Sequence, residues 1–121
     1  MIKWPDGNSY LGEHKHHRGH GYGTYHGAHN EDTYTGRYKD DKRNGYGVST
    51  WPDGEAHYGQ YKDDKAEGYG LFKYPNGDEY DGQWENNMSS GMAVYKYAAT
   101  GVIQREQWKD HERIKVIEVL N

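Results

Sequence analysis

Histidines are concentrated in the N-terminal part of the chain, where they could bind a transition metal or titrate near neutral pH. Imidazole nitrogens are ligands for zinc, copper and nickel. No Cys is present, however, and the spacing of the histidines fits no closed zinc motif. We therefore expect no metal site, and we expect the cluster to give this end of the molecule a positive charge that depends on pH. The cluster holds six of the eight histidines, which are His14, His16, His17, His20, His26 and His29.

Carboxylates and glycine-rich segments are the other features that suggest chemistry. The pairs Asp40–Asp41 and Asp63–Asp64 are each followed by a lysine, and nothing around them supplies the roughly six ordered oxygen ligands of a calcium loop. The segment Gly19–Gly23 is rich in glycine, but the sequence after it does not predict the helix that a phosphate-binding loop requires. No Ser stands in a nucleophile elbow. The sequence thus predicts neither catalytic residues nor a cofactor.

The composition narrows the classes of fold and partner. Of 121 residues, 17 are Gly, 13 are Tyr and 4 are Trp, whereas Leu, Ile, Val and Phe are too scarce to fill a conventional layered core. The core of any fold must therefore consist of tyrosine and tryptophan side chains packed on glycines. The net charge of −4 disfavours nucleic acid as a partner. Without an apolar run of about 18 residues or a signal peptide, a cytoplasmic protein is expected.

A repeat of 23 or 24 residues organises the chain. Each unit begins with an aromatic residue or histidine, a glycine stands two residues later, and a second glycine comes nine residues after the first. An aromatic-Pro-Asp/Asn-Gly turn closes the units, as in Trp51–Gly54 and Tyr74–Gly77, and Trp4–Gly7 has the same form. The glycine pairs are Gly12 and Gly21, Gly36 and Gly45, Gly59 and Gly68, and Gly82 and Gly91.

Each unit is predicted to form a β-hairpin. Residues Tyr34–Lys39 alternate in the period of a strand, and Asp40–Asn44 and Asp63–Glu67 have the length of five-residue connectors. Rings on one strand can then lie over the bare backbone of glycines on its neighbour, an arrangement that lets the rings serve as the core. On this register Tyr34, Gly36 and Tyr38 share a face, as do Gly45, Gly47 and Trp51.

The repeated pattern resembles the MORN repeat (membrane occupation and recognition nexus) over residues 4–103. His14 and His57 depart from it in aromatic positions, Gly27 replaces a closing aromatic residue, and Ala93 replaces a glycine. The resemblance implies an all-β fold, a single elongated and twisted antiparallel sheet of consecutive MORN-type hairpins, open at its ends, with one face curled into an aromatic-lined groove. The expected division is the end of a preceding unit at 1–9, repeats at 10–33, 34–56, 57–79 and 80–103, and a degenerate unit at 104–121.

The last segment, 104–121, is rich in aliphatic residues. Aligning Trp108 with Trp84 predicts a loop over Lys109–Arg113 and a returning strand over Ile114–Leu120. This unit could close the open edge as a cap or pair with a second copy of the chain as a homodimer, and a short helix over the last strand is a third possibility. The candidate interface residues are Trp108, Ile114, Val116, Ile117, Val119 and Leu120.

The resemblance implies a non-catalytic binding or scaffold protein, because the family includes cytoskeletal, ciliary and membrane-contact scaffolds. Tyr and Trp have apolar bodies and polar tips, which suit them to interfaces. We therefore expect a protein partner in the groove, within a larger assembly. The candidate contact residues are Tyr38, Trp51, Tyr61, Tyr74, Trp84 and Tyr97.

Two alternatives remain open at this point. One is binding to an anionic membrane surface, for which acidic residues at the same hairpin tips are unfavourable. The other is a regulatory fragment of a larger enzyme, because MORN-like repeats accompany lipid kinases and methyltransferases. The candidate contacts to lipid headgroups are Lys15, Arg18, Lys39, Lys42 and Arg43.

Overall fold

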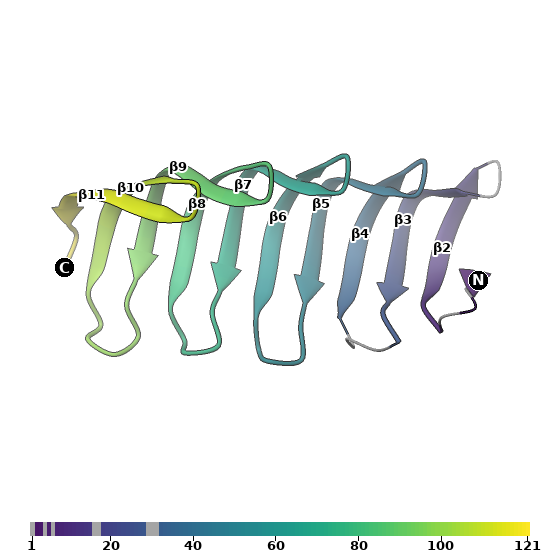
Figure 1. Ribbon diagram of the computed structural model, residues 1–121, viewed down its shortest axis with the longest axis horizontal. Helices are drawn as coiled ribbons and strands as arrows, with labels where there is room; N and C mark the ends of the chain where they lie inside the picture. Colours follow the sequence, from purple (N-terminus) through teal and green to yellow (C-terminus); the bar gives the residue numbers. More distant parts are fainter. Residues whose placement is uncertain (1, 4, 6, 16–17, 29–31) are drawn as a thin grey trace.

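The protein is one antiparallel sheet in which each strand pairs with the next along the chain (Figure 1). The computed structural model describes residues 2–3, 5, 7–15, 18–28 and 32–121, so Trp4, His16, His17 and His29 lie outside the described residues. Across the described part there are eleven strands and no helix, which confirms the all-β open repeat sheet. The strands are β1 (Ile2–Lys3), β2 (Ser9–Lys15), β3 (Arg18–His26), β4 (Thr33–Lys39), β5 (Lys42–Thr50), β6 (Ala56–Lys62), β7 (Lys65–Lys73), β8 (Glu79–Glu85), β9 (Met88–Lys96), β10 (Ile103–Lys109) and β11 (Glu112–Val119).

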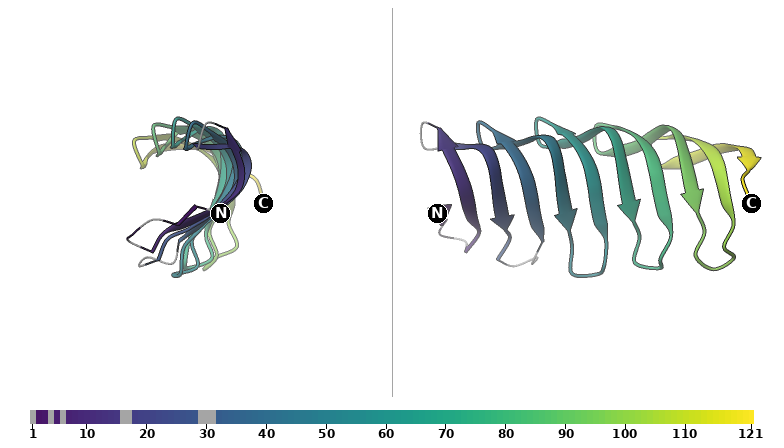
Figure 2. Two further views of the ribbon diagram at one scale, coloured as in Figure 1. Left: turned by 90° about the vertical axis from the view of Figure 1, so that its right-hand side faces the viewer. Right: turned by 180° about the vertical axis from the view of Figure 1, so that it is seen from behind.

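The sheet is elongated, and its strands bend across the short direction. Seen along the long axis, the described part has a C-shaped section with one concave and one convex face (Figure 2). The chain begins at one end of the sheet and finishes at the other, at the outer strand β11. The concave face therefore runs along many consecutive hairpins.

Alternation along each strand decides which side chains reach the concave face. In β4, Tyr34, Gly36 and Tyr38 are buried while the residues between them are exposed, as the sequence predicts. Gly47 is buried on the same face, and Trp51 is half-buried. Gly45 differs from the prediction, because it lies at a bulge with φ +99° and approaches the side chain of Arg37 on the convex face.

A row of directly paired glycines crosses the sheet under the concave face. A Cβ placed on Gly36 would lie 2.5 Å from the Cα of Gly47, so a side chain here would require the backbone to move. Ala93 and then Glu106 continue the row on β9 and β10. We call these glycines the glycine row: Gly12, Gly23, Gly36, Gly47, Gly59, Gly70 and Gly82.

Tyrosine rings cover this row. A Cβ placed on Gly47 would lie 2.3 Å from the Oη of Tyr34 and 2.4 Å from its Cε2, so the ring occupies the space of the missing side chain. The Tyr34 hydroxyl donates a hydrogen bond to the carbonyl of Arg37 at 2.9 Å. The Tyr34 ring meets those of Tyr38 and Tyr61 edge to face, at centroid distances of 5.1 and 5.2 Å. These T-shaped contacts, which favour aromatic packing, replace an aliphatic core.

The hairpin turns are shorter than predicted. Asp40 and Asp41 form a two-residue turn with φ of 50° and 66°, and β5 resumes at Lys42. The five-residue connectors were therefore wrong, because Asp and Asn tolerate the left-handed backbone of tight hairpins. The predicted loop over Lys109–Arg113 was too long for the same reason, since only Asp110 and His111 separate β10 from β11.

In the four two-residue turns that the structure describes, at 40–41, 63–64, 86–87 and 110–111, the second residue ties its hairpin to the preceding one. The Oδ1 of Asp64 accepts a hydrogen bond from the amide of Arg43 at 2.7 Å, and the Oδ1 of Asn87 accepts one from the amide of Ala66 at 2.7 Å. Asp41 and His111 make the corresponding contacts to Gly19 and Ser89. Because the turns dock in series, one edge of the concave face is held by a repeated polar contact.

Candidate functional site

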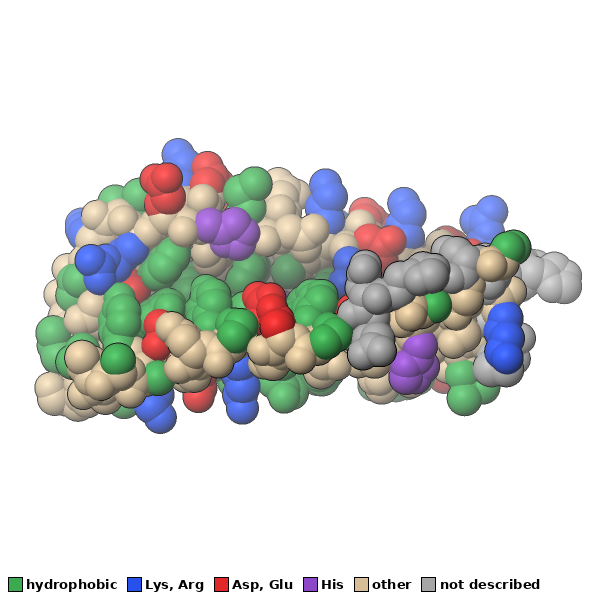
Figure 3. Space-filling model, turned by 60° about the horizontal axis from the view of Figure 1, so that its bottom comes forward, with side chains coloured by type: hydrophobic (Ala, Val, Ile, Leu, Met, Phe, Trp, Pro, Cys, Tyr) green, Lys and Arg blue, Asp and Glu red, His purple; other side chains and the backbone are tan. Residues whose placement is uncertain are grey.

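The concave face contains two open hollows lined by aromatic side chains. One, of about 500 Å³, lies over the N-terminal repeats, and the other, of about 720 Å³, lies over the C-terminal repeats. Trp51 and Arg43 line both hollows, so the two meet near the middle of the sheet. Figure 3 shows hydrophobic side chains gathered along this recess between its two rims. We call the two hollows together the groove.

Most of the predicted contact residues line the groove, but they differ in exposure. Tyr38, Tyr61 and Trp84 are 9%, 5% and 7% exposed, so they belong to the core beneath the groove. Trp51 and Tyr74 are half-buried and line the C-terminal hollow, where a ligand could reach them.

Tyr97 is the sixth predicted contact residue, and it is tied to a buried carboxylate. Its ring packs on that of Tyr95 at a centroid distance of 4.5 Å. Its hydroxyl donates a hydrogen bond to Glu106 at 2.6 Å. The Glu106 side chain is fully buried and also accepts hydrogen bonds from Gln104 and Trp108, with Arg113 3.6 Å away. This carboxylate therefore locks the last hairpins together.

His57 occupies the place of a tyrosine in the neighbouring repeats. It covers Gly70 as Tyr34 covers Gly47, and its side chain is 2% exposed. Its Nε2 has no hydrogen-bond partner among the described residues, whereas the Tyr80 hydroxyl one repeat later donates to the carbonyl of Gln83. Burial, and then the charge of Arg43, lower the pKa of His57 to about 4.

Replacing His57 with Tyr is expected to stabilise the protein by about 1 kcal/mol at pH 7, because the hydroxyl can make the bond that His57 lacks. The unfolded chain binds the histidine proton more tightly than the folded chain does. Neutral His57 therefore makes its full contribution to the free energy of unfolding above about pH 6.5, and this contribution is lost as the pH falls toward 4. Urea unfolding of both proteins measures the difference in the free energy of unfolding between His57→Tyr and the wild type. This difference should grow by roughly 3 kcal/mol from pH 7 to pH 4. A difference that stays constant over this range would contradict the burial of a neutral His57.

The residues predicted to contact lipid headgroups do not share one face. Lys39 and Lys42 are exposed cross-strand partners, as are Lys15 and Arg18. Arg43 instead lines the groove and pairs with Asp64. The set therefore divides between the hairpin ends and the concave face.

The residues predicted to form a C-terminal interface lie on and beside the outer strand β11. Trp108 is half-buried and stacks on Tyr95 at 5.7 Å, so it belongs to the aromatic layer. The other five are exposed, at 41% to 58%. They are Ile114, Val116, Ile117, Val119 and Leu120.

Over the described residues, no group of three or more His, Asp or Glu side chains is placed to hold a metal ion. Within the same ranges, no helix has the length and apolar character needed to cross a bilayer.

Sequence reasoning missed several residues of the groove. Phe72 and Tyr95 line the C-terminal hollow, and Asp41 and Asp64 line the N-terminal one. Phe72 and Tyr95 stand two residues after Gly70 and Ala93, so the period of two along a strand could have placed them on the same face as the glycine row. The two aspartates follow from their turn position, because a two-residue turn directs its second side chain toward the preceding hairpin.

Comparison with protein families agrees with this architecture. The MORN repeat matches residues 34–56, 57–79 and 80–100, which correspond to β4 through β9 and the turns between them. A search among curated proteins found no match. Because the three matched segments cover more than half of the 121 residues, the chain belongs to the MORN repeat family.

Proposed function

We propose that the protein is a non-catalytic docking module whose groove receives a segment of a partner protein. MORN repeats are generally non-enzymatic modules, consistent with a binding or scaffold role. The observation that carries the proposal is the groove, where half-buried aromatic side chains such as Trp51 and Tyr74 line hollows that stay open to solvent. Aromatic side chains of this kind are enriched where proteins bind one another.

The shape of the groove favours an elongated partner segment. It extends over consecutive hairpins, and each two-strand repeat advances it by roughly 10 Å. A segment lying along it could contact Trp51 and Tyr74 in succession, since the two rings lie in adjacent repeats of the same hollow. Such a module suits a large assembly, cytoskeletal or ciliary structures among them, in which it would join extended partners.

Loss of groove aromatics is expected to release the partner. Trp51→Ala and Tyr74→Ala should each weaken partner capture at least tenfold, because truncating a buried aromatic anchor commonly costs 2 kcal/mol or more, about thirtyfold. The measurement is chemical cross-linking in the native source, followed by identification of the captured proteins and a titration with the purified partner. Circular dichroism and urea unfolding establish that each variant is folded.

Tyr46→Ala is the matched control for this experiment. Tyr46 is 53% exposed and belongs to the convex face, so its loss removes the same kind of side chain away from the groove. It should leave capture unchanged. If the two groove variants fold and keep the same partners at the same affinity, the docking function is wrong.

We also propose that β11 pairs with the β11 of a second copy. An outer strand presents unpaired backbone groups to other chains, and β11 adds exposed aliphatic side chains that do not protect it. Light scattering should give the mass of two chains for the wild type and of one chain for Val116→Pro, and a monomeric wild type would overturn the pairing.

A further inference from the structure

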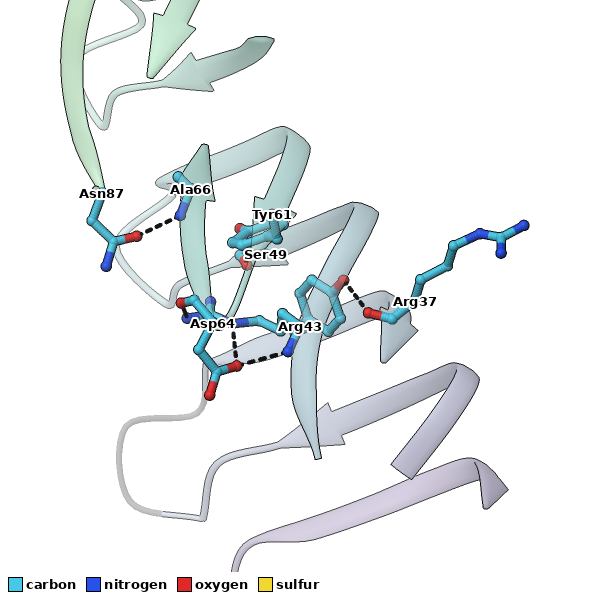
Figure 4. Close-up of polar contacts among 8 residues, drawn as sticks. Arg37, Arg43, Ser49, Tyr61, Asp64, Ala66 and Asn87 are labelled. Atoms are coloured by element: carbon cyan, nitrogen blue, oxygen red, sulfur yellow. Dashed lines mark hydrogen bonds and ion pairs between the residues drawn. The ribbon is translucent and has the colours of Figure 1, made fainter. Parts of the chain in front are cut away.

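The protein holds one of its own arginine side chains in the groove, and this contact shows what the groove can bind. The guanidinium carbon of Arg43 lies 4.7 Å from the ring centroid of Tyr61. The Arg43 Nε is 3.3 Å from the Oδ1 of Asp64, and the Arg43 side chain is only 28% exposed. Figure 4 shows Arg43 joined to Asp64 near Tyr61. Aromatic faces and a carboxylate together attract a guanidinium by cation–π and charge-assisted contacts.

Two rings and one carboxylate form this arginine cradle. Arg43 also lies 5.7 Å from the centroid of Tyr34, whose ring meets that of Tyr61 at 5.2 Å and 88°. The turn residue Asp64 is held in place because its Oδ1 accepts the amide of Arg43 at 2.7 Å. The cradle therefore consists of parts that recur with the repeat.

The preceding repeat contains the same cradle without an arginine. Tyr10, Tyr38 and Asp41 stand 23 or 24 residues before the three cradle residues. The rings of Tyr10 and Tyr38 meet at 4.8 Å and 83°. The Oδ1 of Asp41 accepts the amide of Gly19 at 2.6 Å. Gly19 thus takes the position of Arg43, and a glycine brings no side chain to the rings.

The other repeats lack the carboxylate. Asn87 and His111 occupy the turn position of Asp41 and make the same backbone contact without a negative charge. The N-terminal hollow is lined by Asp32 and Asp41 as well as by the paired Asp64 and Arg43. Among the described residues that line it, carboxylates therefore outnumber cations, and the hollow favours a positively charged group.

We propose that Tyr10, Tyr38 and Asp41 bind an arginine side chain of the docked partner segment. The guanidinium would enter the N-terminal hollow, which all three residues line, and pair with Asp41 where the hollow meets the two largely buried rings. This inference rests on the proposed docking function and names the chemistry of the partner, which is a basic segment.

Peptide titration of the full chain tests the arginine site directly. The probes are acetyl-Gly-Arg-Gly-amide and the same peptide with citrulline, which has nearly the shape of arginine but no charge. NMR signals of the Gly19 amide and of the Tyr10 and Tyr38 rings report binding. We expect the arginine peptide to bind at least about tenfold more tightly than the citrulline peptide, and the preference to fall with added salt.

Three variants locate the binding. Asp41→Asn should reduce the preference for arginine to within about twofold while the fold persists, because Asn87 accepts the same backbone bond in a later repeat. Asp63→Asn removes an equal charge from an exposed first turn position and should keep the full preference. Gly19→Arg should fill the cradle from within and abolish binding of the peptide at the Tyr10 and Tyr38 signals.

The outcomes separate this inference from the docking function. Equal affinity for the two peptides, or a full arginine preference in Asp41→Asn, would overturn the arginine site. Docking would still stand if Trp51→Ala released the purified partner while Asp41→Asn and Gly19→Arg kept it. If Trp51→Ala, Asp41→Asn and Gly19→Arg all kept the partner at unchanged affinity, both proposals would be wrong.

Discussion

Gly36→Val is expected to lower the free energy of unfolding by about 3 kcal/mol, one of the two largest effects of a single substitution anticipated in this protein. The nearest atom to a new Cβ at Gly36 is the Cα of Gly47, at 2.5 Å, and the Oη of Tyr34 follows at 2.7 Å. A flexible side chain could yield, but a paired backbone cannot do so without opening the hairpin between β4 and β5. Urea unfolding followed by tyrosine and tryptophan fluorescence measures the loss.

Thr35→Val is the matched control for this substitution. Thr35 is the neighbour of Gly36 in β4, it is exposed on the convex face, and both valines are β-branched residues that suit strands. Its effect should stay within about 0.5 kcal/mol. If Gly36→Val were as stable as Thr35→Val, close approach across the glycine row would not be needed for the fold.

Glu106→Ala is expected to cost about 3–5 kcal/mol, because it leaves buried donors around an empty position. The Glu106 carboxylate accepts hydrogen bonds from Tyr97, Gln104 and Trp108 at 2.6, 2.6 and 2.8 Å. Its removal should loosen β10 and β11 first, so hydrogen exchange should quicken in these strands before the central ones. Urea unfolding of the same variant gives the total loss.

Glu118→Gln is the control for Glu106→Ala, because it removes an exposed carboxylate in place of a buried one. Glu118 pairs with Arg105 at 2.6 Å, but both side chains are about half exposed. Ion pairs of this kind contribute about 1 kcal/mol or less. If Glu106→Ala and Glu118→Gln lowered the free energy of unfolding by equal amounts, the buried carboxylate of Glu106 would not be what stabilises the last hairpins.

The sequence predicts the architecture because its signals are local and repeated. The spacing of Gly36, Gly59 and Gly82 sets the register, and the alternation around Tyr34 identifies the buried face. The family match over 34–100 and the paired strands agree with this prediction. In a single-layer sheet each strand pairs only with its neighbours along the chain, so local sequence patterns are enough to predict the architecture.

Other features depend on geometry that spacing does not reveal. Asp40–Asp41 could belong to a five-residue connector or a two-residue turn, and the choice depends on the bulge at Gly45. In the sequence, Arg43 adjoins Lys42 and is therefore predicted to be a basic surface residue, but alternation along the strand turns it to the opposite face. Glu106 had no sequence signal, because it breaks the glycine pattern at the degenerate end of the chain.

Proton NMR of the two Hα atoms of Gly47 tests the central structural claim most directly. If the Tyr34 ring occupies the place of the missing side chain, one Hα lies against the ring, since a Cβ there would be 2.4 Å from Cε2 and Cζ. That proton should resonate upfield of the usual glycine range and show strong nuclear Overhauser effects to the ring protons of Tyr34. Two unshifted Hα signals without such contacts would mean that the ring does not cover the glycine.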